Sequence, residues 1–225
     1  MQQIATKRVF FVTGEQGCGK STFLAAFIQK FTLQPSGFIT KKEGTQEPTL
    51  YIHQMINGTT QFRYEVDNRA GICSPPKPVG FAPVFDAYGV MCLMQAEKSI
   101  HTLTAARSDI VQKGAPIQPF DTNETATPQQ HQPVILMDEL GVMEAEAKFF
   151  FRTVCNLLSN PRYYIIGVVK PRGTRFLPVL EQMPEAAVFH LTVQNRPVLY
   201  ALLEQAQSFT AFLDVVGAES PNGKT

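Results

Sequence analysis

The feature that most constrains the fold is a glycine-rich loop between an apolar run and a helical pattern near the start of the chain. The stretch beginning at Arg8 reads "RVFFVTGEQGCGKSTFLAAFIQKF". The β-branched and aromatic residues of 9–13 predict a buried strand, and the apolar spacing after Lys20 predicts a helix. The chain therefore begins its fold as strand, tight loop and helix.

Four positions of this loop match G-x-x-x-x-G-K-[ST], the phosphate-binding P-loop. Glycines let successive backbone N–H groups face phosphate oxygens, and the start of the helix adds its positive dipole end. In this motif the lysine reaches the β- and γ-phosphates, and the serine hydroxyl ligates Mg²⁺. We expect nucleotide contacts from Gly14, Glu15, Gln16, Gly17, Cys18, Gly19, Lys20, Ser21 and Thr22.

A second apolar run ends in two adjacent acids, in "VILMDEL" from Val134. Burying an ionised carboxylate costs several kcal/mol unless a positive group compensates it. We expect Asp138 to hold Mg²⁺ together with Ser21, and Glu139 to act catalytically beside the γ-phosphate with Lys20. A plain strand terminus followed by a helix N-cap is the alternative.

Strands and helices alternate along the rest of the chain. This order predicts an α/β three-layer sandwich, in which a mostly parallel central sheet has helices on both faces. Further strands are expected at 35–40, 162–169 and 186–193. Helices are expected over 84–107 in two pieces, 144–160, 174–183 and about 195–213.

Two segments interrupt the alternation. Residues 49–66 hold two apolar runs around Asn57-Gly58, which predicts an inserted β-hairpin. Four prolines make 67–83 a loop, and the polar, proline-rich 113–133 is a mobile lid or a surface insertion. We therefore expect one domain over 1–216 and a flexible tail over 217–225.

Taken together, "GEQGCGKST", "GFIT", "MDELGVME" and "LTVQNRPVL" resemble the small P-loop nucleoside-triphosphatase family. The resemblance spans most of the chain and implies the P-loop NTPase form of the sandwich. It also implies slow hydrolysis of ATP, GTP and other nucleoside triphosphates with Mg²⁺. The chain departs from the family at Val142, where a basic residue is frequent, before Val84, and in the length of 99–133.

Basic residues follow two later strands, at the sheet edge where α/β proteins bind ligands. Arg172 or Arg175 is a candidate for contacting transition-state charge on the γ-phosphate, the alternative being a solvated basic turn. Asn195 and Arg196 are candidates for reading the base or ribose, against a helix N-cap with a surface arginine. Glu144 either orients Glu139 or the water shell of the metal, or stabilises a helix dipole as a first-turn acid.

Composition limits the classes of molecule that the protein is expected to bind. The formal net charge is +1, which provides no basic field for a nucleic-acid backbone. No apolar run approaches the roughly 20 residues of a membrane helix, and no leader pattern is present. The four cysteines show no paired spacing. We expect a cytoplasmic protein with reduced thiols, nucleoside triphosphates as partners, and neither nucleic acid nor membrane.

Three functions fit this pattern. The leading one is Mg²⁺-dependent hydrolysis of nucleoside triphosphates to diphosphate and phosphate with broad base tolerance. A P-loop kinase acting on a nucleoside or metabolite is the second, and it requires a pocket for the acceptor. A nucleotide-gated binding switch is the third.

Overall fold

In the computed structural model, residues 6–73, 77–112 and 133–219 are described. The strands are β1 Val9–Thr13, β2 Ser36–Glu43, β3 Thr49–Ile56, β4 Thr59–Gln61, β5 Arg69–Ile72, β6 Val79–Gly80, β7 Val134–Leu140, β8 Tyr164–Val169 and β9 Ala186–His190. Within these ranges they form one nine-stranded sheet in the order β6-β5-β3-β2-β7-β8-β1-β9, with β4 beside β3.

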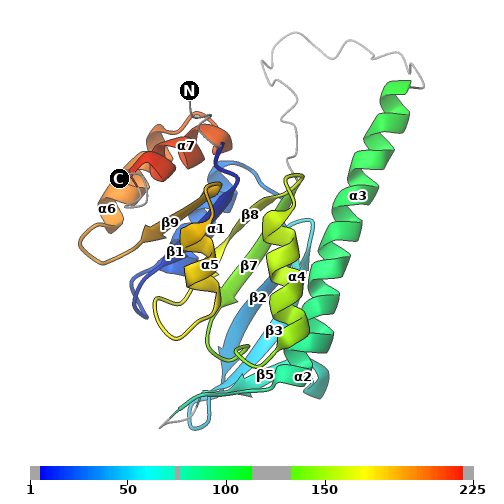
Figure 1. Cartoon of the computed structure of the whole chain (residues 1–225), viewed down its shortest axis with the longest axis vertical. Coiled ribbons are helices and arrows are strands. Elements are labelled where there is room, and N and C mark those ends of the chain that lie inside the picture. Colours follow the sequence, from blue (N-terminus) through cyan, green and yellow to red (C-terminus); the bar gives the residue numbers. More distant parts are fainter. Residues whose placement is uncertain (1–5, 74–76, 113–132, 220–225) are drawn as a thin grey trace.

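Helices cover both faces of the sheet (Figure 1). They are α1 Lys20–Lys30, the 3₁₀ turn η1 Val66–Asn68, α2 Ala82–Val84, the π-helical η2 Phe85–Gly89, α3 Val90–Gln112, α4 Lys148–Ser159, α5 Phe176–Gln182, α6 Arg196–Gln205 and α7 Phe209–Glu219. Helices α3, α4 and α5 pack on one face, and α1, α6 and α7 on the other. Among the described helices none is long and apolar enough to span a membrane.

Strand β1 shows why the sheet is buried on both faces. It lies between β8 and β9 and is parallel to both. Its residues alternate, with Val9 and Phe11 in the core under α4 and α5, and Phe10 and Val12 in the core under α1 and α7. Strands β2 and β7 continue the parallel order. The predicted α/β sandwich with a mostly parallel sheet is therefore confirmed.

An antiparallel extension, β3 to β6, widens the sheet beyond β2. The predicted hairpin is present, and Asn57 and Gly58 both have positive φ, as a two-residue type I′ turn requires. Its second strand ends at Gln61, however, and the prediction that 67–83 is all loop is wrong. Strand β5 pairs with β3 and β6 pairs with β5, because β3 leaves an open edge where β4 stops.

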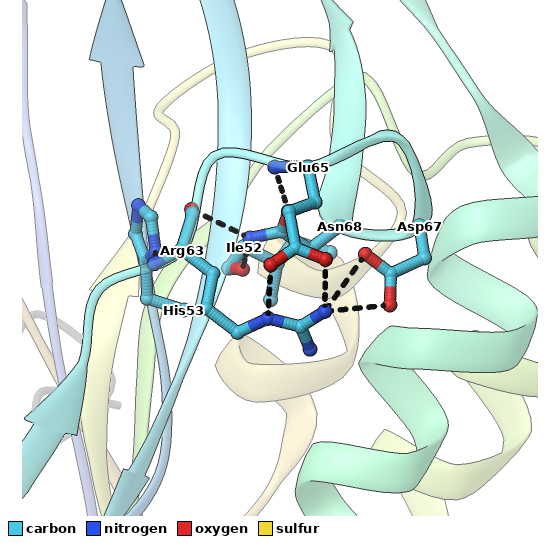
Figure 2. Close-up of polar contacts among 6 residues, drawn as sticks. All are labelled: Ile52, His53, Arg63, Glu65, Asp67 and Asn68. Atoms are coloured by element: carbon cyan, nitrogen blue, oxygen red, sulfur yellow. Dashed lines mark hydrogen bonds and ion pairs between the residues drawn. The ribbon is translucent and has the colours of Figure 1, made fainter.

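Residues 62–68 bridge the gap between β4 and β5 with side-chain hydrogen bonds (Figure 2). The buried Asn68 amide donates to the carbonyl oxygens of Ile52 at 2.8 Å and Arg63 at 2.9 Å, and its oxygen accepts from the Glu65 N–H at 2.9 Å. The Arg63 guanidinium lies between the carboxylates of Glu65 and Asp67. Asn68 thus replaces the strand partner that Ile52 lacks on the side of β3 facing away from β2.

Other boundaries also differ from the sequence expectations. The helix predicted from 144 begins at Lys148, and the predicted last helix is split into α6 and α7 by a break at 206–208. The predicted two pieces of 84–107 are one helical run, in which η2 leads directly into α3. Helix α7 continues to Glu219, past the expected start of the tail at 217. Residues 113–132 and 220–225 lie outside the described residues.

We predict that Asn68→Ala lowers the free energy of unfolding by about 1–3 kcal/mol, because two carbonyl groups lose their donor inside the protein. Urea denaturation of the purified variant measures this change. Val66→Ala, at the highly exposed neighbour, is the control and should stay within about 0.5 kcal/mol of the parent. Equal stability of the two variants would show that Asn68 does not hold the bridge.

Candidate functional site

The carboxyl ends of the parallel strands meet at one edge of the sheet, where open α/β proteins bind their ligands. A cavity of about 570 Å³ lies there. It is lined by Gly14, Glu15, Gln16, Gly17, Gly19, Lys20, Ser21, Thr22, Lys42, Glu139, Lys170, Pro171 and Arg172. The P-loop follows β1, while the other lining residues come from β2, β7 and the turn after β8.

Two glycines fix the shape of the P-loop. Gly14 has φ 143°, and a Cβ built on it would lie 2.1 Å from the carbonyl oxygen of Leu191, so only glycine fits where the loop passes the end of β9. Gly19 has φ 101° and caps α1 from the left-handed region. The loop is therefore curled by backbone conformations that side chains other than glycine rarely adopt.

The start of α1 is suited to an anion. Its cap, Gly19, has no side chain to bond the first-turn N–H groups, and the first turn holds no acid. These N–H groups lack partners within the helix, so they are available to a phosphate. The Lys20 ammonium donates to the carbonyl oxygens of Gly14 at 2.8 Å and Glu15 at 2.9 Å, which holds it over the loop.

Asp138 and Glu139 lie at the end of β7, beside the P-loop. A register irregularity between Asp138 and Leu140 leaves Glu139 without a partner on β8. Such a bulge breaks the alternation that would send adjacent side chains to opposite faces. Asp138 hydrogen-bonds the Ser21 side chain. Burial, together with the charge of Glu139, raises the pKa of Asp138 to about 7, although Ser21 and Lys20 act to lower it.

Glu139 faces the cavity between basic residues. Its carboxylate lies 3.6 Å from the Lys170 ammonium, and Lys42 lines the same cavity from the end of β2. Sequence reasoning did not select Lys42, because the strand was expected to end at 40, whereas β2 continues to Glu43. The "KK" after "GFIT" was the available signal. The N-cap alternative for these acids is wrong, since the next helix after β7 is α4, which begins only at Lys148.

The two candidate arginines lie apart. Arg172 lines the cavity, and its guanidinium pairs with the Glu15 carboxylate at 3.5 Å, with both side chains exposed. The Arg175 guanidinium lies over the Phe151 ring at 4.0 Å and donates to the Ala145 carbonyl oxygen at 3.1 Å. Arg175 is absent from the cavity lining, so of these two arginines only Arg172 lies at the cavity.

The remaining predicted residues surround the loop without lining the cavity. The Asn195 side chain accepts from the Thr192 N–H and donates to the His190 carbonyl oxygen, so both of its groups are used locally. Arg196 is exposed, and its Cδ lies 3.4 Å from a Cβ built on Gly19. Cys18 is buried in the core under α1. Cys18 therefore differs from its neighbours in the loop, which line the cavity.

A smaller chamber of about 100 Å³ adjoins the cavity and shares Lys42, Glu139 and Lys170 with it. Glu144, only 3% exposed, lines this chamber and accepts a hydrogen bond from the Gly141 N–H. Burial raises the pKa of Glu144 to about 7, although its hydrogen bonds and Lys170 oppose the shift. Because α4 begins only at Lys148, Glu144 is not the first-turn helix acid that was one expectation.

Comparison with known proteins agrees with this geometry. The model of a family described as NTPase matches residues 120–203. The bovine cancer-related nucleoside-triphosphatase homolog is 24% identical over 192 residues, covering 84% of this chain and 90% of that protein. Nucleoside-triphosphatase THEP1 of Aquifex aeolicus strain VF5 is 23% identical over 189 residues, covering 84% and 92%.

The crystal structure of THEP1 from the hyperthermophile Aquifex aeolicus shares the fold. It superimposes with a TM-score of 0.55 at 20% identity, over 87% of this chain and 95% of that one. The human cancer-related nucleoside-triphosphatase is 22% identical over 192 residues, 84% of this chain and 90% of that protein. Over most of its length the chain is thus similar in sequence to proteins named nucleoside-triphosphatases, and it shares the fold of THEP1.

Proposed function

We propose that this protein hydrolyses nucleoside 5′-triphosphates to diphosphate and phosphate in a Mg²⁺-dependent reaction. The observation that carries the proposal is the cavity lined by the P-loop, Ser21 and Glu139, with the buried Asp138 interacting with Ser21 behind it. The family match and the nucleoside-triphosphatase names of the relatives support the same activity.

Phosphate binding would rest on the P-loop and its neighbouring cations. The first-turn N–H groups of α1 receive phosphate oxygens, and Lys20 exchanges its two carbonyl bonds for the β- and γ-phosphates. Lys42, Lys170 and Arg172 lie on the same cavity and balance further negative charge. Arg172 leaves its exposed pairing with Glu15 at little cost, since such pairs contribute about 0–1 kcal/mol.

The Ser21 hydroxyl and the Asp138 carboxylate fit a hard divalent cation. Both offer oxygen ligands, and Ser21 acts on the Asp138 carboxylate, whose charged form is disfavoured by burial and by Glu139. These two residues would hold Mg²⁺. When bound, the ion neutralises charge on the transferred phosphoryl group.

Glu139 would act on the attacking water. The water oxygen forms a bond to the γ-phosphorus, the bond from that phosphorus to the bridging oxygen breaks, and the diphosphate leaves. Glu139 orients the water and accepts its proton, while the Lys170 ammonium at 3.6 Å holds the carboxylate in place. Asp138 and Glu139 therefore have different roles despite being adjacent.

Broad base tolerance is part of the proposal. The cavity is lined mainly by P-loop residues and by basic side chains such as Lys42, Lys170 and Arg172. These groups bind phosphates and do not distinguish one base from another. The Asn195 amide, the sequence candidate for base reading, already uses its groups on Thr192 and His190. A cytoplasmic location is also proposed, and four free cysteine thiols suit a reducing compartment.

We predict that Lys20→Ala weakens ATP binding by about 10- to 100-fold, the value of one or two charge-assisted hydrogen bonds. The melting temperature should stay close to that of the parent, because Lys20 contributes little to the core. Calorimetric titration and thermal melting measure the two effects. Lys30→Ala, at the exposed end of the same helix, is the control and should bind normally. Unchanged affinity in Lys20→Ala would refute the phosphate-binding role.

We predict separate phenotypes for the two acids of β7. Asp138→Asn should raise the Mg²⁺ concentration needed for half-maximal turnover by about 10-fold or more, because an amide binds a divalent ion poorly. Glu139→Gln should lower kcat by about 10²- to 10⁴-fold with nearly unchanged nucleotide affinity. Phosphate release at saturating MgATP and a binding titration measure both. If Glu139→Gln turns over like the exposed Glu146→Gln control, Glu139 does not activate water.

We predict that the dissociation constants of ATP, GTP, CTP and UTP lie within about 10-fold of one another, equivalent to 1.4 kcal/mol. Binding through phosphates gives each nucleotide the same contacts. Parallel titrations with the four nucleotides measure the spread. A preference of about 100-fold for one base, or 2.7 kcal/mol, would show a base-reading contact that this proposal lacks.

A further inference from the structure

The small chamber beside the phosphate cavity has a defined place in the reaction. Its lining contains no P-loop residue, whereas the larger cavity is lined mostly by that loop. The loop holds the leaving diphosphate side of the substrate, and the attacking oxygen must enter roughly in line from the opposite side. Glu139 belongs to both spaces, so the chamber opens where its carboxylate can reach a nucleophile.

The size of the chamber selects the nucleophile. Its volume of about 100 Å³ corresponds to about three waters at roughly 30 Å³ each. Pockets for drug-sized organic molecules, a class that includes nucleosides, measure roughly 300–1,000 Å³. The chamber therefore suits water and is too small for the nucleoside acceptor that a kinase would need.

Glu144 joins the walls of this chamber. It accepts a hydrogen bond from the Gly141 N–H, and its Oε2 lies 3.7 Å from a Cβ built on Gly141. The Lys170 side chain lies against the same glycine, at 3.3 Å from that Cβ position, and its charge acts on Glu144. Lys170 in turn pairs with Glu139. The buried carboxylate thus connects the turn after β7 to the lysine that holds Glu139.

We propose that this chamber is the binding site of the attacking water, and that Glu144 is the positioning residue that holds Gly141 and Lys170 around it. The inference rests on the hydrolysis proposed above and names its nucleophile site. Glu144 touches neither the phosphate loop nor the cavity of the nucleotide. Its effect is therefore on turnover and not on nucleotide affinity.

Two pairs of variants test the proposal in the full-length protein. Glu144→Gln keeps a hydrogen-bond acceptor for Gly141 but removes the charge that acts on Lys170, and Glu146→Gln is the matched exposed control. Val142→Phe fills the chamber from a residue that does not line the larger cavity, and the same substitution at the exposed Val215 of α7 is its matched control. Each variant is assayed for phosphate release at saturating MgATP, for binding of a non-hydrolysable ATP analogue, and for melting temperature.

We predict that Glu144→Gln and Val142→Phe lower kcat by about 10- to 100-fold, the usual effect of misplacing a reacting group. Affinity for the analogue should stay within about threefold of the parent, or 0.65 kcal/mol. Both controls should turn over like the parent. A purely structural role of Glu144 would instead lower the melting temperature and the affinity together, which would overturn its positioning role.

The outcomes separate this inference from the proposed function. If the parent releases phosphate but both test variants turn over like their controls, the chamber does not hold the water, although hydrolysis stands. Phosphorylation of added adenosine by the parent would also overturn the inference, because the chamber excludes such acceptors. If the parent releases no phosphate from any nucleoside triphosphate, the proposed hydrolysis fails and the inference fails with it.

Discussion

The carboxylates at the end of β7 depend on the positive groups and donors that the other strand ends bring to them. Two acids at a sheet edge would be costly if they stood alone, because desolvation and mutual repulsion both oppose their ionisation. Ser21 bonds Asp138, and Lys170 pairs with Glu139 at 3.6 Å. The parallel order of β1, β7 and β8 makes these contacts, since it places the three strand ends side by side.

The site combines rigid and exchangeable parts. The P-loop is fixed by Gly14, which passes against the carbonyl oxygen of Leu191 and leaves no room for a side chain. The cations around it are held by weaker contacts, such as Lys20 on two backbone carbonyl oxygens and Arg172 on the exposed Glu15. Such contacts can be exchanged for phosphate oxygens at low cost. The P-loop backbone is therefore rigid before a ligand binds, whereas the charged side chains around it can change their partners on binding.

The insertion beyond β2 also contributes to the site. Strand β3 pairs with β2 over seven residue pairs, from Gly37 with Met55 to Glu43 with Thr49, and this pairing keeps β2 extended as far as Lys42. Leu50 on β3 closes the small chamber beside Glu139 and Glu144. The Asn68 bridge in turn completes the far edge of β3. The antiparallel extension, which the sequence predicts as an inserted hairpin, thus supports one wall of the proposed water site.

The sequence alone predicted the P-loop, the acidic strand end and the mostly parallel sheet, because each depends on local spacing or on the order in which strands and helices alternate. Only the tertiary structure decided which basic residues reach the cavity. It brought Lys42 and Arg172 there, and it placed Arg175 on Phe151 and the Asn195 amide on its own turn. It also turned Glu144 inward and placed β5 where a loop was expected. These outcomes depend on contacts between residues far apart in the chain, and local patterns carry no information about such distances.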